Sequence, residues 1–203
     1  HLYAGGQFST VGGLTTSGIA RWDGTAWYAL GSGMGGGNVY ALAIDGSGNV
    51  YAGGDFSTAG GVTVNYIARW NGSSWSALGS GMSLFVNALA LDGAGNLYAG
   101  GYFTVAGGVT ANRIAKWNGS AWSALGTGMN DVVNALVLDG AGNLYAGGSF
   151  VSAGGTTANR IAKWNGSAWS ALGSGMNGLL NALAFDLSGN LYAGGGFSTA
   201  GGT

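Results

Sequence analysis

Three uncharged amides recur at 47-residue intervals and offer chemistry suited to recognition. Asn87, Asn134 and Asn181 each open a short apolar segment, and Tyr40 takes the equivalent place nearer the N-terminus. A side-chain amide both donates and accepts hydrogen bonds, so it is a good partner for sugar hydroxyls. We therefore expect a ring of ligand-binding amides. The alternative is that each Asn satisfies neighbouring backbone groups.

A second set of positions carries a different residue in each repeat, although the residues before it are the same. These residues directly follow a Gly-Gly pair, and they are Gln7, Asp55, Tyr102 and Ser149. Because binding residues concentrate on loops held by a rigid scaffold, we predict that these four positions contribute to a ligand-binding surface. The alternative is neutral variation at an exposed position.

Carboxylates also recur, but singly. One aspartate stands before a glycine-containing turn in each repeat, at Asp45, Asp92, Asp139 and Asp186. A calcium loop needs several oxygen ligands at close spacing, so one carboxylate per turn predicts turn capping and no metal site. Basic residues recur on another segment, at Arg21, Arg69, Lys116 and Lys163, and we expect them to form ion pairs with these aspartates.

The composition argues against several classes of function. The chain has no cysteine, its seven acidic residues are all aspartate, and its one histidine is His1. General acid–base catalysis needs suitably placed and tuned groups, so we expect no enzyme, no cofactor and no catalytic metal. Charged residues make up 6% of the chain and the net charge is −1, which disfavours binding to nucleic acid. No apolar run reaches the ~20 residues of a transmembrane helix, so no membrane insertion is expected.

Internal repeats predict the elements that position these side chains. The strings "LYAGG" or "VYAGG" begin at Leu2, Val50, Leu97, Leu144 and Leu191. Each full repeat holds four short strand candidates, which in the third repeat are residues 87–91, 96–101, 112–117 and 121–125. Four antiparallel strands at this spacing are typical of propeller blades. We predict one all-β propeller domain over residues 1–203, with repeats starting near 2, 50, 97 and 144 and a partial repeat from 191.

In a propeller, the turns after the first and third strands of each blade lie on one face. The loops after the second and fourth strands lie on the other face. Glycine is abundant, at 45 residues, and recurs between the apolar runs, where it suits turns. Asn118-Gly119 favours a type I′ hairpin between the third and fourth strands. A two-residue or a four-residue loop places Trp117 and Trp122 on one face, as an apolar plate that we expect to pack against the next blade. The loops after the second and fourth strands vary between repeats, and we expect any binding surface on the face that they share.

The strings "ALALDGAGNLYAGG", "IAKWNGS" and "AWSAL" resemble the blades of kelch and galactose-oxidase-like propellers. The repeats are also similar to those of large bacterial secreted or surface proteins. The resemblance implies a propeller fold and an extracellular or cell-surface location. The copper site of galactose oxidase uses Tyr, Cys and His, and a chain without cysteine does not match it.

These observations predict a non-catalytic interaction or structural module that binds a protein or glycan partner through its variable loop face. The alternative is a carbohydrate-binding lectin propeller with one pocket per blade. The repeats supply more strands than four blades need and fewer than five need. We therefore expect about four blades, as an arc of a larger propeller, whose uncovered blade faces self-association would bury.

Overall fold

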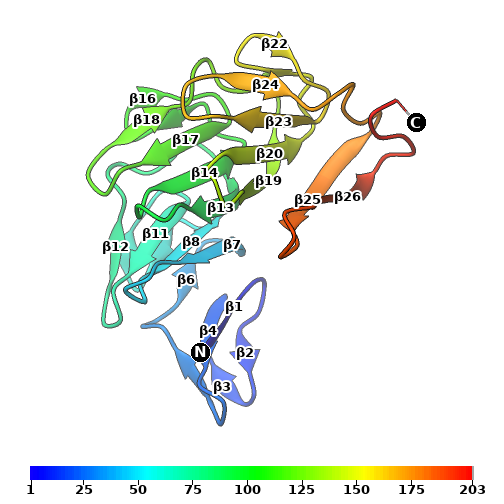
Figure 1. Ribbon diagram of the computed structural model, residues 1–203. Helices are drawn as coiled ribbons and strands as arrows, with labels where there is room; N and C mark the ends of the chain where they lie inside the picture. The colour runs from blue at the N-terminus through cyan, green and yellow to red at the C-terminus, as the bar shows by residue number, and fades with distance from the viewer. Residues whose placement is uncertain (203) are drawn as a thin grey trace.

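The chain folds into antiparallel β-structure. The computed structural model describes residues 1–202, and within this range it contains no helix. Figure 1 shows the sheets following one another around an open arc from the N-terminus to the C-terminus. This arrangement confirms the predicted propeller architecture of four-stranded antiparallel blades. No helix in the described range is long and apolar enough to cross a membrane.

Three blades have all four strands, hydrogen-bonded in sequence order. Blade 2 contains β7 (Val39–Ile44), β8 (Val50–Gly54), β11 (Ile67–Trp70) and β12 (Trp75–Ala77). Blade 3 contains β13 (Val86–Leu91), β14 (Leu97–Gly101), β17 (Ile114–Trp117) and β18 (Trp122–Ala124). Blade 4 contains β19 (Val133–Leu138), β20 (Leu144–Gly148), β23 (Ile161–Trp164) and β24 (Trp169–Ala171). The first strands β7, β13 and β19 lie next to one another along the inside of the arc.

The two ends of the arc are shorter sheets. Blade 1 contains β1 (Leu2–Gly5), β4 (Ile19–Trp22) and β5 (Trp27–Ala29). Blade 5 contains only β25 (Leu179–Phe185) and β26 (Leu191–Gly196). Each end sheet therefore has a strand with one unpaired edge: β1 in blade 1 and β26 in blade 5.

The connection between the second and third strands of a blade is more ordered than expected for a loop. It forms a small hairpin in four blades: β2 (Thr10–Val11) with β3 (Leu14–Thr15), β9 (Thr58–Ala59) with β10 (Val62–Thr63), β15 (Val105–Ala106) with β16 (Val109–Thr110), and β21 (Ser152–Ala153) with β22 (Thr156–Thr157). The turn of the third is Gly107-Gly108, with φ of 57° and 86°. Two positive φ values suit a two-residue hairpin, and glycine adopts them without strain.

These hairpins also join neighbouring blades. Met129 precedes blade 4 and pairs with Ala153 in the hairpin of that blade, and Met82 pairs with Ala106 in the same way. In blade 2 this pairing is long enough to form a strand, β6 (Met34–Gly35), against β9. The segment that links two blades is therefore fixed by backbone hydrogen bonds.

The hairpin between the third and fourth strands differs from the predicted type I′ turn. Trp117 pairs directly with Trp122, which leaves a four-residue loop. The Oδ1 of Asn118 accepts the backbone N–H groups of Ser120 and Ala121, at 3.0 and 2.9 Å. This side chain stabilises the wider turn by satisfying two amides inside it. The predicted plate forms, with the two indole centroids 5.4 Å apart.

The plates of blades 2, 3 and 4 pack against the preceding blade and not against the next one as predicted, because one indole N–H of each plate bonds a backbone carbonyl of the preceding blade. The Nε1–H of Trp122 donates to the carbonyl of Leu78 at 2.9 Å, and Trp122 is 5% exposed. Between these plates lie aliphatic and aromatic side chains that are fully buried, led by Phe56, Phe103 and Phe150. The core is therefore a series of similar layers between successive blades.

The recurring aspartates cap turns, as predicted. The Oδ1 of Asp92 accepts the backbone N–H groups of Ala94 and Asn96, at 3.0 and 2.8 Å. Its Oδ2 accepts the side-chain amide of Asn96 at 2.7 Å. The expected ion pair with the basic set is present in blade 4, where Lys163 lies 3.9 Å from Asp139. In blade 3, Lys116 instead lies over the ring of Tyr98.

Candidate functional site

The recurring amides lie at β-bulges. In β13, Val86 pairs with Gly101 and Ala88 pairs with Gly100, so Asn87 is an extra residue outside the ladder. A bulge re-aims the side chain of the extra residue relative to the pleat. The same irregularity occurs in every first strand, at Tyr40, Asn87, Asn134 and Asn181. The β-bulge therefore orients the predicted amides. No pattern in the sequence had predicted this bulge.

Two of these amides and the tyrosine meet at one cavity. It has a volume of about 570 Å³ and is lined by Tyr40, Phe85, Asn87, Tyr102 and Asn134. Tyr40 comes from blade 2 and Asn134 from blade 4, and the other three residues come from blade 3. We call it the aromatic–amide cavity. It brings together three of the predicted site residues: Asn87, Asn134 and Tyr102.

Aromatic rings form one wall of the aromatic–amide cavity. Phe85 contacts Tyr102 edge to face, with centroids 6.1 Å apart, and it contacts Tyr66 at 5.6 Å on its other side. Tyr40, Phe85 and Tyr102 remain 48%, 36% and 43% exposed. Edge-to-face contacts fix the orientation of the rings, so this wall is preorganised and still reachable by a ligand.

Tyr66 holds its place in an unfavourable backbone conformation. Its φ is +66°, in the left-handed region that costs a residue with a side chain roughly 1–2 kcal/mol. Blade 1 has Gly18 at this position, while blades 3 and 4 have Arg113 and Arg160. The Nη1 of Arg113 donates to the backbone carbonyl of Tyr102. The strained residues of blades 2 and 3 thus both support the aromatic wall.

The amides form a hydrogen-bonded series. The Nδ2 of Asn87 donates to the Oδ1 of Asn134 at 3.2 Å, and the Nδ2 of Asn134 donates to the carbonyl of Leu180 at 3.2 Å. Asn134 thus binds a neighbouring amide and a backbone group, and ligand binding by these amides stays a prediction. Asn181 is exposed and does not line the cavity.

Asp55 contributes to the aromatic–amide cavity indirectly. Its Oδ2 accepts the hydroxyl of Tyr40 at 2.7 Å, and its Oδ1 accepts the backbone N–H of Asn38. The hydrogen bond to Asp55 raises the pKa of Tyr40, so its hydroxyl stays protonated at neutral pH. Asp55 therefore orients a wall residue without lining the cavity.

Gln7 and Ser149 lie away from the aromatic–amide cavity. Gln7 lines a separate hollow with Phe8 and Asn38 in its wall, and the backbone carbonyl of Ser149 accepts a hydrogen bond from Arg160. Of the four positions after the Gly-Gly pairs, Tyr102 lines the aromatic–amide cavity and Asp55 binds one of its wall residues, whereas Gln7 and Ser149 do not line it.

Sequence reasoning did not single out Phe85 or Tyr66. The signal for Phe85 was present, since it is an aromatic residue in a variable loop where the next blade has Val132. Tyr66 carried no such signal, because its importance comes from its φ angle and its contact with Phe85.

Acidic residues do not gather into a metal site in the described chain. Within residues 1–202, no group of three or more His, Cys, Asp or Glu side chains is placed to hold a metal ion. The aromatic–amide cavity itself has uncharged walls. Its chemistry is therefore hydrogen bonding by amides and hydroxyls beside apolar ring surface.

Comparison with known proteins supports the propeller repeats. Residues 46–73 match a family described as a β-propeller domain of unknown function, DUF5122. No curated protein matches the chain significantly. The matched segment covers the end of the first turn of blade 2 and its strands β8 and β11. It establishes propeller repeats, and the kelch type stays a prediction.

Two solved structures from B. thetaiotaomicron are similar in fold. The extracellular domain of a putative one-component system has a TM-score of 0.53 and 17% identity, over 77% of this chain and 20% of that chain. The extracellular domain of a putative hybrid two-component system has a TM-score of 0.54 and 11% identity, over 88% of this chain and 24% of that chain. The chain thus spans a fifth to a quarter of these relatives.

Proposed function

We propose that the protein is a non-catalytic extracellular recognition module whose aromatic–amide cavity binds a neutral saccharide. The observation that carries this proposal is the meeting of exposed aromatic rings and uncharged amides at one cavity. The proposal combines the binding surface expected on the variable loop face with the carbohydrate-binding alternative.

The chemistry of the walls favours a sugar over other small ligands. A pyranose ring has an apolar C–H face and a rim of hydroxyl groups. Phe85 and Tyr102 offer apolar ring surface, and the Oδ1 of Asn87 accepts no hydrogen bond from residues 1–202. A few convergent polar groups in a mostly apolar cavity are the usual basis of ligand specificity. None of the five wall residues carries a full charge, so the cavity gives no ion pair to an anion or a cation.

The extracellular location rests on the similar structures and on the resemblance of the repeats, and the composition supports the non-catalytic role. Both similar structures are extracellular domains of bacterial proteins. The resemblance to repeats of secreted and surface proteins agrees with that location. Low charge and the absence of internal histidine, cysteine and glutamate support a non-catalytic role.

We expect one binding site per chain. The counterparts of Tyr102 in blades 2 and 4 are Asp55 and Ser149, and the counterparts of Phe85 are Asn38 and Val132. Within residues 1–202, blade 3 is therefore the one blade that combines both aromatic residues. The other first strands keep the bulge, but their blades lack the aromatic pair equivalent to Phe85 and Tyr102.

A glycan array followed by titration calorimetry tests the proposal. The wild-type chain should bind a neutral glycan with a stoichiometry near one. Tyr102→Ser copies blade 4, and Asn87→Ala removes the free acceptor. We expect each to weaken binding by at least about 10-fold, which corresponds to ~1.4 kcal/mol.

Ser149→Ala is the matched control, because it changes the equivalent position of a blade outside the cavity, and its affinity should equal that of the wild type. A blank array, or equal binding by the Tyr102→Ser variant, contradicts the proposal. Capture of a protein through the same residues would instead assign this face to a protein partner.

A further inference from the structure

The contacts between blades 1 and 2, 2 and 3, and 3 and 4 share one design. In each, a tryptophan of the fourth strand donates its Nε1–H to the carbonyl of a leucine in the preceding blade. The pairs are Trp75 with Leu30, Trp122 with Leu78 and Trp169 with Leu125, at 2.8, 2.9 and 2.9 Å. The glycine after each leucine lies beneath the indole plate of the following blade. We call this arrangement the blade joint.

Blade 4 presents the acceptor half of a fourth joint, with nothing on it. Leu172 is half-buried, whereas its counterparts Leu78 and Leu125 are 2% exposed. A Cβ at Gly126 would lie 3.6 Å from Trp164, but a Cβ at Gly173 would meet no atom within 4 Å. The space that an indole plate fills in the other joints is therefore open at Leu172 and Gly173.

Blade 1 presents the donor half at the other end of the arc. Trp22 and Trp27 have ring centroids 5.5 Å apart at 50°, the same geometry as Trp70 and Trp75. Trp27 is half-buried where Trp75 is 5% exposed. Its Nε1–H has no acceptor among residues 1–202, although the equivalent group of Trp75 bonds Leu30. The free donor and the free acceptor belong to the same kind of joint.

The strand sequences at the two ends match as well. The sequence of β26 begins with Leu191–Gly195, "LYAGG", which is identical to Leu2–Gly6 around β1. In blade 1, β1 pairs with β4 through Leu2 with Trp22 and Gly5 with Ile19. In the single chain β1 occupies this edge of β4, so β26 pairs with β4 of a second copy in the same register by taking the place of its β1. The result is a sheet of β25, β26, β4 and β5, which has the strand order of blades 2, 3 and 4.

The charges at the two ends are complementary. In blade 4, Lys163 on the third strand lies 3.9 Å from Asp139 in the first turn. Asp186 is the equivalent carboxylate in blade 5, and no basic group of residues 1–202 forms an ion pair with it. Arg21 is the equivalent base in blade 1, where it lies over Tyr28 without a carboxylate partner. Joining β4 to β26 brings Arg21 towards Asp186.

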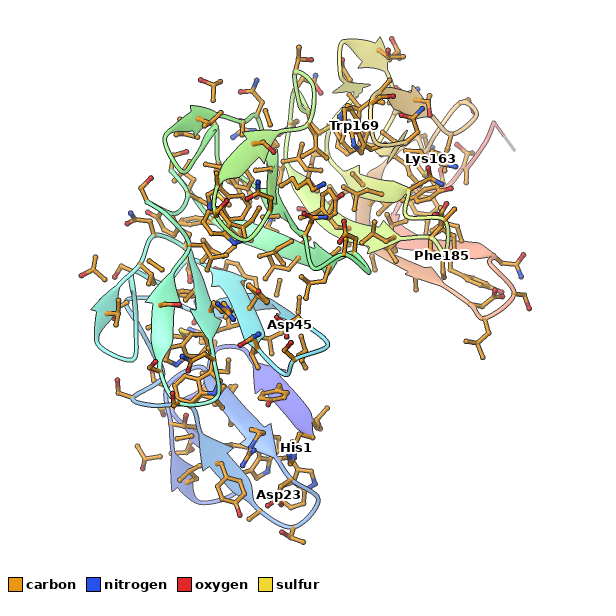
Figure 2. All side chains as sticks on the ribbon, turned by 60° about the vertical axis from the view of Figure 1, so that its left-hand side comes forward. His1, Asp23, Asp45, Lys163, Trp169 and Phe185 are labelled. Atoms are coloured by element: carbon orange, nitrogen blue, oxygen red, sulfur yellow. The ribbon has the colours of Figure 1, made fainter. Side chains whose placement is uncertain are left out.

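The two halves do not meet within one chain. Blade 1 and the β25–β26 hairpin lie at opposite ends of the open arc in Figure 1. Figure 2, seen from another side, also separates His1, next to β1, from Phe185 in β25. We propose that a second copy of this chain supplies its β4–β5 hairpin to β26 and its Trp27 to Leu172, which completes blade 5 between the two copies. Such a head-to-tail contact builds a closed ring or an extended assembly.

One substitution separates assembly from folding. Gly194 is open in the single chain, where a Cβ would meet only the Cβ of Ala182, at 4.0 Å. Its counterpart Gly5 lies against blade 2, where a Cβ would be 2.5 Å from the Cγ1 of Val39. In the completed blade, Gly194 replaces Gly5 and meets Val39 of the second copy. Gly194→Val should therefore leave the chain folded and block the contact.

Sedimentation velocity of residues 1–203 measures the outcome. The wild-type chain should sediment as a dimer or larger species, and Gly194→Val as a folded monomer with an unchanged circular dichroism spectrum. The control is Gly196→Ser, since the counterparts of Gly196 include Ser149, and it should assemble like the wild type. A monomeric wild type, or assembly unaffected by Gly194→Val, overturns the proposal.

A disulfide test identifies the partner strand. The chain has no cysteine, so Arg21→Cys and Tyr192→Cys introduce single thiols on β4 and β26. Oxidation of a mixture of the two variants should give a disulfide-linked heterodimer. If the double variant forms the bond within one chain and sediments as a monomer, the chain closes on itself and the second-copy assignment is wrong.

Discussion

Asn87 reaches the aromatic–amide cavity because one residue of β13 stands outside its ladder. Val86 and Ala88 keep their cross-strand partners, so the bulge changes the direction of a single side chain. The amide then meets Asn134 of the next blade at 3.2 Å. Two blades are thus linked at the site by a side-chain hydrogen bond that the strand pattern alone does not require.

A second single residue, Asp92, makes the folding stability of the protein depend on pH. Partial burial acts to raise the pKa of Asp92, but hydrogen bonds from Asn96 and Ala94 outweigh it and hold the pKa below its ordinary value. A carboxylate whose folded pKa is lowered stabilises the protein above its unfolded pKa of about 4, and that stabilisation is lost as the pH falls through the folded pKa.

We therefore expect the melting temperature to fall as the solution is acidified below about pH 4. Asp92→Asn should lower the melting temperature at neutral pH and weaken its dependence on acid, as measured by calorimetry at several pH values. Asp131→Asn is the control, because Asp131 lies in an exposed loop outside the capped turns. An Asp92→Asn profile parallel to that of the wild type would refute this role.

At the scale of elements, close contact between strands of neighbouring blades explains a repeated glycine. A Cβ at Gly100 in β14 would lie 2.5 Å from the Cγ1 of Val133 in β19. Gly100→Ala should destabilise the fold by about 1–3 kcal/mol, because one added methyl group overpacks this layer. Urea unfolding measures the change. Gly93→Ala is the control, since its Cβ would meet nothing within 4 Å, and an equal loss in both variants would contradict the packing argument.

The repeats and turn residues predicted the blades because each strand is local and bounded by its own turn. Trp117 and Trp122 share a face in either register, so the plate was predictable while the loop length was not. The small hairpin at Gly107-Gly108 was missed because two-residue strands have too little alternation to recognise. The bulge at Asn87 and the left-handed Tyr66 were missed because both depend on backbone geometry that many residue types permit.

For the molecule as a whole, stability is spread along the arc. Blades 1 to 4 contact one another through similar joints, so the stability of this part approximates a sum of blade and joint contributions. The two-stranded blade 5 has one neighbour, and most residues of β25 and β26 are exposed or half-buried. It is therefore the least supported part of the single chain.

Hydrogen exchange should show this gradient directly. In the monomeric Gly194→Val variant, amides of β26 should exchange faster than those of β20, the equivalent strand of a complete blade. In the assembled wild type, β26 should gain protection because both of its edges are paired. Equal protection of β26 and β20 in the monomer would show that the arc unfolds as one cooperative unit.

The bulge in every first strand also has an evolutionary consequence. Tyr40, Asn87, Asn134 and Asn181 occupy equivalent places, and tyrosine has replaced the amide once while the flanking ladder pairs are kept. Under the proposed function, a mutation there changes the ligand-binding surface while leaving the buried layers as they were. Duplicated blades can therefore acquire new specificities one at a time, and an engineer can vary the same four positions as a small library on an unchanged framework.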